Sequence, residues 1–244
     1  NADGEFERFG IYENSIMEPA LATQYPEIKS YIGIGIDNPS TSVYFSISPL
    51  GFKSMTLYAD KSPVFIEPYS QDLNTYSVYK KSDKKQAFTA FECSMIDEIA
   101  PEIDSSLLRP NADDAKLRTF RLAMSVTGEY TTYFGGTKAL ALAAINNTMT
   151  RVNAIFEKDF STRMVLIANN DAVIYTNAST DPYSVSSSMA NWNTQLQSTL
   201  TSVIGEANYD VGHLFGASGG GGNAGCIGCV CVNGSKGSGY TSPA

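Results

Sequence analysis

The hydrophobic pattern of this chain changes near its midpoint, and this change limits the folds available to it. From Glu5 to about Pro68, short apolar segments alternate with polar residues and are separated by turn residues, as in β-strands. After about Ala115, alternating segments are separated by stretches in which apolar residues recur every three or four positions, as in amphipathic helices. A chain of 244 residues can form one large domain or two modest ones. The pattern therefore predicts two units of different architecture.

The first unit is predicted to be a small, twisted, antiparallel β-domain. Isoleucines alternate with glycines over 32–36, turn residues follow at 37–40, and alternation resumes over 43–47, which predicts a hairpin. Further short apolar runs separated by prolines continue this pattern. The early helical candidate, Met17 to Tyr25, is ended by Pro26.

The second unit is predicted to have the order β-α-β-α-β. Strands are expected at 120–126, 164–168 and 211–215. The first helix is expected to follow Gly135-Gly136-Thr137 and reach Phe156, and the second to run from a cap at 186–188 to Gly205. Strands joined by helices favour a mixed, mostly parallel, twisted sheet with crossover connections.

The region between the two units, about Tyr69 to Lys116, shows little regularity and is predicted to be an extended, polar linker. We therefore divide the chain into residues 1–115, a β-rich domain with its linker, and residues 116–244, the second domain. The expected fold class is α+β or α/β, with an antiparallel domain followed by a mostly parallel one.

Composition excludes some classes of partner. The formal net charge of −8 and the pI near 4.7 argue against nucleic acid, whose phosphates an acidic chain would repel. No stretch approaches the roughly 20 apolar residues that span a bilayer. Charged residues make up only 17%, while Ser, Thr, Asn, Gly and Tyr are abundant, a balance that favours a secreted protein.

The glycine- and cysteine-rich segment from Gly219 to Ser235 admits three chemical interpretations. A phosphate-binding loop would need G-x-x-x-x-G-K-[ST] between a strand and a helix, which is absent, or G-x-G-x-x-G after the first strand, where it does not occur. A metal site could use Cys226, Cys229 and Cys231, but a second C-x-x-C is lacking and Cys93 is distant in sequence. An edge strand is the simplest account, with Cys229 and Cys231 on one face as buried residues or disulfide partners.

His213 is the only histidine, which excludes a centre with several histidine ligands. It lies within the apolar run 211–215, so a structural role is expected. No catalytic residue and no metal ligand are predicted within this chain.

Ordered strings in the second half point to a family. They are Phe120-Arg121-Leu122-Ala123, Gly128-Glu129-Tyr130, the helix end at 151–160, and 208–215 before a glycine-rich loop. Over Leu117 to about Gly239 the chain resembles bacterial reprolysin-like zinc metalloproteases, which are metzincins. The first half, notably Tyr25 to Tyr31, resembles the propeptide that precedes such a domain.

The chain departs from that family in one major respect. Metzincins carry H-E-x-x-H-x-x-G-x-x-H, whose histidines bind zinc and whose glutamate acts as the base, and this motif is absent here. The resemblance therefore implies a propeptide plus the N-terminal part of a protease domain, with the zinc-binding helix outside this chain. Zinc is expected in the complete protease and not in this chain, which alone should be inactive. The implied partners are a peptide or protein substrate and the remaining C-terminal part of the catalytic domain.

The resemblance also implies two binding roles. Metzincins pair substrate backbone with a sheet-edge strand, and the corresponding residues here are Ala224, Gly225, Cys226, Ile227 and Gly228. Some metzincin propeptides keep the enzyme latent with a cysteine thiolate, and Cys93 is the candidate. An ordinary edge strand and a buried or disulfide-bonded Cys93 are the structural alternatives.

The function that these observations favour is that of a secreted zinc metalloendopeptidase precursor. The alternative is a non-catalytic secreted module that captures extended peptides at an exposed β-edge.

Overall fold

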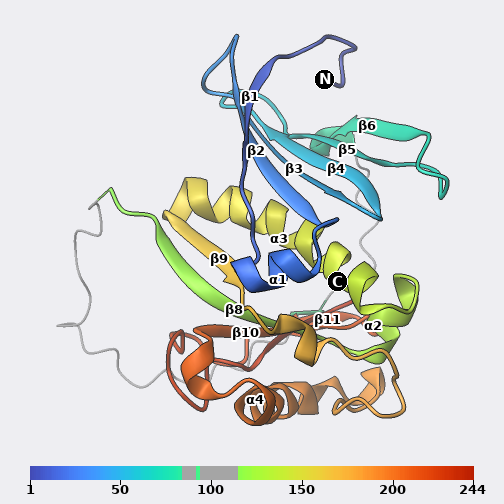
Figure 1. The fold of residues 1–244 in the computed structure, drawn as a ribbon, viewed down its shortest axis with the longest axis vertical. Coiled ribbons are helices and arrows are strands. Elements are labelled where there is room, and N and C mark those ends of the chain that lie inside the picture. The colour runs from blue at the N-terminus through green and yellow to red at the C-terminus, as the bar shows by residue number, and fades with distance from the viewer. Residues whose placement is uncertain (84–91, 94–114) are drawn as a thin grey trace.

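The protein has two β-sheets with one long helix between them. The computed structural model describes residues 1–83, 92–93 and 115–244, and of residues 92–93 it describes the backbone. The first sheet, helix α3, the second sheet and helix α4 follow one another as layers (Figure 1). The fold is therefore mixed α and β, with an antiparallel sheet in the first half and a mostly parallel sheet in the second, as predicted.

The first sheet is a six-stranded antiparallel meander. Its strands, in spatial and sequence order, are β1 (Phe9–Glu13), β2 (Lys29–Gly35), β3 (Ser42–Ser48), β4 (Gly51–Leu57), β5 (Val64–Pro68) and β6 (Tyr76–Lys80). The predicted hairpin is confirmed, since β2 pairs with β3 from Lys29↔Ile47 to Ile34↔Ser42. Strand β6 was not predicted, because its residues fall in the expected linker. It is fixed by pairing with β5 along its whole length, which local sequence does not reveal.

The second sheet also has six strands. In spatial order they are β7 (Glu92–Cys93), β11 (Gly221–Asn223), β12 (Gly239–Ser242), β10 (Val211–Phe215), β8 (Arg118–Val126) and β9 (Thr162–Leu166). Strands β9, β8, β10 and β12 are mutually parallel, and β11 runs antiparallel to β12. The predicted strands at 120–126, 164–168 and 211–215 correspond to β8, β9 and β10. Strand β12 was missed because it is short and polar.

The helices begin and end largely where sequence chemistry places them. They are α1 (Pro19–Gln24), α2 (Gly128–Tyr133), α3 (Lys138–Phe160) and α4 (Trp192–Val203), with 3-10 turns η1 (Lys81–Asp83), η3 (Asn170–Val173), η4 (Ser186–Asn191) and η5 (Glu206–Asn208). The hydroxyl of Thr137 caps α3 by accepting from the Leu140 N–H, and Ser161 ends it in the left-handed region. The predicted start of α4 was early, because Ser188 has non-helical backbone angles and only a 3-10 turn precedes Trp192.

Helix α3 contacts both sheets. On one side, Leu142, Ile145 and Met149 are buried in the main core with residues of β8 and β9. On the other, Ala154 packs with Tyr44, Met55 and Leu57 of the first sheet. Helix α4 covers the opposite face of the second sheet, where Leu196 and Leu200 pack on Ala123, Leu214 and Tyr240. No helix in the part of the chain that the structure describes is long and apolar enough to cross a membrane.

Candidate functional site: a sheet edge and an open groove

The sheet edge at β11 is formed by glycine. Gly221 and Gly222 are buried in a strand that pairs antiparallel with β12, from Gly221↔Ser242 to Asn223↔Tyr240. Gly219, just before the strand, has a φ of 97°, and a Cβ there would lie 2.9 Å from the Met189 sulfur. The chain can make this close turn only without a side chain. The glycine run therefore forms a short strand that has no side chains at its first two positions.

Strand β7 pairs with this edge. Glu92 aligns with Gly221 and Cys93 with Gly222, and the two strands run parallel. Residues of the predicted N-terminal domain therefore add a strand to the second sheet, as in recognition by β-strand addition. The sequence did not predict this contact. The Cys93 side chain lies outside the described residues, so its proposed role in latency stays a prediction.

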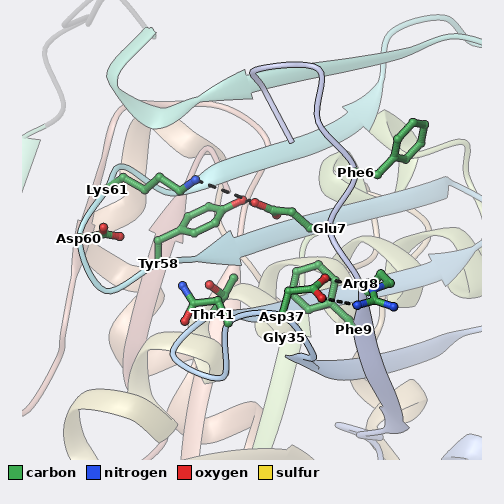
Figure 2. Close-up of a pocket in the computed structure, with 11 residues that line it drawn as sticks. Phe6, Glu7, Arg8, Phe9, Gly35, Asp37, Thr41, Tyr58, Asp60 and Lys61 are labelled. Atoms are coloured by element: carbon green, nitrogen blue, oxygen red, sulfur yellow. Dashed lines mark hydrogen bonds and ion pairs between the residues drawn. The ribbon is translucent and has the colours of Figure 1, made fainter.

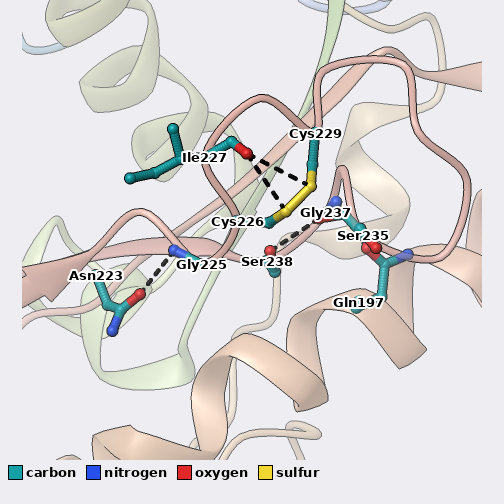
Figure 3. The surroundings of a disulfide bond; sticks show 9 residues. All are labelled: Gln197, Asn223, Gly225, Cys226, Ile227, Cys229, Ser235, Gly237 and Ser238. Carbon is teal, nitrogen blue, oxygen red and sulfur yellow. Dashed lines mark hydrogen bonds between the residues drawn. A yellow bond between two sulfur atoms is a disulfide. The ribbon is translucent and has the colours of Figure 1, made fainter. Parts of the chain in front are cut away.

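The residues predicted as the edge strand, Ala224 to Gly228, lie in the loop that follows β11. The expected strand at these positions was wrong by three residues, because Gly225 and Gly228 have φ values of 74° and 78° and turn the chain. The Gly225 N–H donates to the Asn223 Oδ1 at 2.6 Å and fixes the first turn (Figure 3). The substrate-binding role of this loop remains a prediction.

A disulfide joins Cys226 and Cys229 within this loop (Figure 3). Their Cα atoms are 5.6 Å apart, which suits a disulfide. Cys231 has a free, exposed thiol and a φ of 64°, so Cys229 and Cys231 do not share a buried strand face as expected. Of the two roles expected for Cys229 and Cys231, a disulfide is present at Cys229, with a partner that was not predicted, and burial is wrong for Cys231.

The donor groups of the described residues do not fit the zinc site of a metzincin. Within residues 1–83, 92–93 and 115–244, no three His, Cys, Asp or Glu residues lie close enough together to hold a metal ion. Two of the cysteines in the loop are bonded to each other. The one histidine makes a contact of its own, described below.

An open groove lies beside α3 on the face of the second sheet that α3 covers only in part. Its volume is about 440 Å³, and its walls come from β8, β10 and α3. The main lining residues are Leu122, Met124, Val152, Phe156, His213 and Phe215. Ala244 lies at the rim, where its N–H donates to the Gly216 carbonyl at 3.0 Å. This is an apolar surface able to accept an amphipathic element.

His213 faces this groove from the middle of β10. Its Nε2 lies 3.0 Å from the Thr241 Oγ1, and its ring packs edge-on against Phe215 with centroids 5.5 Å apart. The surrounding protein lowers the pKa of His213 to about 4, because burial disfavours the charged form. His213 is therefore a neutral hydrogen-bonding group at neutral pH.

A second recess lies beside β11, on the side of the sheet that α4 covers. It has a volume of about 400 Å³ and is bounded by β11, η4 and the start of α4. Its lining is uncharged and includes Met189, Asn193, Asn223 and Tyr240. A strand paired with β11 would direct alternate side chains toward this recess.

A smaller cavity of about 270 Å³ lies in the first sheet, far from β11 in the sequence (Figure 2). Tyr58 Oη donates to Glu7 at 2.7 Å, Lys61 Nζ lies 3.9 Å from Glu7, and Arg8 pairs with Asp37. These contacts hold the N-terminal segment on the sheet. Because Glu7, Arg8, Asp37 and Lys61 are held in these contacts, we assign this cavity a structural role.

The second half is an α/β domain whose mostly parallel sheet includes the antiparallel strand β11, next to a recess of about 400 Å³. Comparison with family models then identifies the group. Residues 116–244, more than half of the chain, match the model for the metallopeptidase family M12B, reprolysin-like, and the chain belongs to this family. A comparison with curated proteins gave no match.

Proposed function

We propose that this chain is the N-terminal part of a secreted zinc metalloendopeptidase precursor. Residues 1–115 would act as its prodomain, and residues 116–244 would form the upper part of its catalytic domain. The M12B family match supports peptide-bond hydrolysis as the reaction of the complete protein. Since the described residues do not fit a zinc site, this chain would contribute substrate positioning and latency.

The observation that carries this proposal is the pairing of β7 with β11. A substrate bound to the edge in the manner of the family would use the same backbone groups of Gly221 and Gly222 that face β7. Strand β7 and a substrate could not occupy this edge together. The prodomain would therefore keep the precursor latent by covering the substrate-binding strand, whether or not the Cys93 thiol also binds a metal.

The groove beside α3 supports the proposal that further chain completes the domain. An exposed apolar surface of this kind favours coverage by another element. We propose that an amphipathic helix carrying the zinc ligands packs there, against Val152, Phe156 and Phe215. The lining is uncharged, which suits the apolar face of such a helix.

The Cys226–Cys229 disulfide supports secretion, because exposed disulfides persist mainly in oxidising compartments. The alternative function, a binding module with a free β-edge, has less support because β7 already occupies that edge.

The test compares this 244-residue chain with the complete product of its gene. We expect the chain alone to hold no stoichiometric zinc and to cleave no peptide, because its described donor groups do not cluster. The complete product, once its prodomain is removed, should contain zinc and cleave a fluorogenic peptide library. Metal content by mass spectrometry and cleavage with and without 1,10-phenanthroline are the measurements. Tightly held zinc or chelator-sensitive cleavage with the 244-residue chain would overturn the proposal.

A further inference from the structure

The first half of the chain also contacts the second half at the edge of the second sheet opposite β7. We propose that residues 14–28, the anchor segment, hold the N-terminal half on the second half after the chain between them is cut. The anchor segment comprises the stretch between β1 and β2, including α1, which lies against the second sheet in Figure 1. The partner surface is β9, the start of α3 and the turn η3.

Backbone hydrogen bonds join the anchor segment to β9. The Leu166 N–H donates to the Ile16 carbonyl at 2.7 Å, and the Glu18 N–H donates to the Leu166 carbonyl at 2.9 Å. Met17 and Leu166 form a parallel bridge between these bonds. The anchor segment thus continues the second sheet beyond β9, and separation would leave these backbone groups without their partners.

Apolar side chains of the anchor segment belong to the core of the second half. Ile16, Met17, Leu21 and Ile28 are each no more than 4% exposed. They share one cluster with residues of α3, β8 and β9, including Leu142, Met149 and Leu166. Separation would expose both sides of this contact to water, and the free-energy cost rises with the apolar area exposed. The contact resembles the interior of a domain more than a transient interface.

Polar contacts surround this apolar centre. The Glu18 Oε2 accepts from the Ala168 N–H at 2.9 Å, and the Gln24 Nε2 donates to Asp171 Oδ2 at 3.1 Å. Arg163 of β9 donates to the Asn14 side chain and to the Ser15 carbonyl. These bonds fix the orientation of the anchor segment on the sheet edge.

A second contact lies away from the anchor segment, between the first sheet and α3. Arg151 pairs with Glu67 at 2.6 Å, and Glu67 also accepts from Tyr79 Oη at 2.8 Å. It combines this partly exposed ion pair, which stabilises little, with one small buried cluster of Tyr44, Met55, Leu57 and Ala154. Strand β7 adds a third contact, through two paired residues. The anchor segment joins a larger buried apolar cluster than the contact with α3 does, so it should contribute most to holding the halves together.

This inference concerns the association of the two halves and does not depend on the enzyme activity. Its consequence for activation rests on the proposed function: a single cut between prodomain and protease would leave a bound complex. Release would require a second event, such as digestion of the anchor segment.

The test uses the full chain with the recognition sequence of a site-specific protease substituted for residues 103–109. After complete cleavage, verified on a denaturing gel, native size-exclusion chromatography at micromolar concentration should show one species containing both fragments. Elution as two separate fragments would overturn the proposal. The readout is association, so its failure is distinct from a failure to find peptidase activity.

Two variants locate the contact. Leu21→Asp places a charge in the shared core and should release the cut fragments, whereas Ile36→Asp, at an exposed isoleucine of the same half, should not. Should Leu21→Asp not fold before cutting, Glu18→Ala keeps the apolar core and removes the bond to Ala168. The cut Glu18→Ala chain should separate at a lower urea concentration than the cut parent. Separation at the same urea concentration would contradict the role of the anchor segment.

Discussion

Replacing Asn170 with alanine should lower the free energy of unfolding by about 3 kcal/mol, since two buried backbone groups would lose their partner. Asn170 is fully buried in η3, and its amide bridges both backbone groups of one residue in β8. The Met124 N–H donates to the Asn170 Oδ1 at 2.7 Å, and the Asn170 Nδ2 donates to the Met124 carbonyl at 3.0 Å. Urea unfolding followed by the fluorescence of Trp192, the single tryptophan, measures the change.

The adjacent Asn169 provides a matched control. It is exposed and makes no side-chain cap bond to η3, so Asn169→Ala should change the free energy of unfolding by less than about 0.5 kcal/mol. If the two substitutions lowered the free energy of unfolding equally, the effect of Asn170→Ala could not be assigned to its bridge to Met124. A large effect confined to Asn170 would identify it as the residue that fixes the turn after β9 against β8.

Acidification should destabilise the protein through His213. Its pKa is about 4 in the folded chain, against an ordinary value of 6.5, because burial disfavours the imidazolium. Between these pH values the unfolded chain binds a proton that the folded chain does not, so stability falls as the pH decreases from about 6.5 to about 4. The loss should be about 2 to 3 kcal/mol, and above pH 6.5 this group should contribute no pH dependence.

Because His213 is the only histidine, one substitution separates its contribution to the pH dependence of stability from that of the carboxylates. In His213→Gln, a polar group can still meet Thr241 while the titration is removed, so the free energy of unfolding should depend less on pH over this range. Carboxylates titrate in both proteins, so their contribution cancels in the difference between the two curves. Identical curves for the parent and the variant, from urea unfolding at each pH, would contradict the lowered pKa.

Much of the fold could be predicted because its signals are local. Alternation over 32–36 and 43–47 placed the β2–β3 hairpin, and the apolar stripe of 142–156 placed α3. Gly135-Gly136-Thr137 marked the start of that helix, because the threonine side chain caps it. Strand β10 was readable as a short apolar run.

The rest depended on contacts between distant residues. Pairing of Glu92 and Cys93 with Gly221 and Gly222 joins segments far apart in the chain, and no local pattern encodes such a register. Helix α2 is short and rests on the Thr127 cap and on the Gly128 N–H bond to Asp181 at 2.7 Å. The pairing of β7 with β11 and the bond between Gly128 and Asp181 each join residues that are distant in the sequence, so neither can be seen in a local pattern.

The candidate site was predictable as a region but not in its detail. The glycine-rich run indicated an edge strand near the end of the chain, and β11 lies there. The family resemblance placed this strand at Ala224 to Gly228, but Gly225 and Gly228 have positive φ angles that turn the chain there. The groove beside α3 could not be predicted, since it results from how β10 and α3 are spaced.

The two sides of α3 differ in how well they would tolerate water. Toward the first sheet, the helix presents Asn147, whose Oδ1 accepts from Ser46 at 3.4 Å, and the guanidinium of Arg151, which stacks 5.1 Å from the Phe65 ring centroid. This side of the helix therefore combines hydrophilic groups with the small apolar cluster around Ala154. If the first half is removed, as the proposed function requires, this side of α3 would expose mainly hydrophilic groups to water, whereas the site left by Leu21 would expose part of the main apolar core.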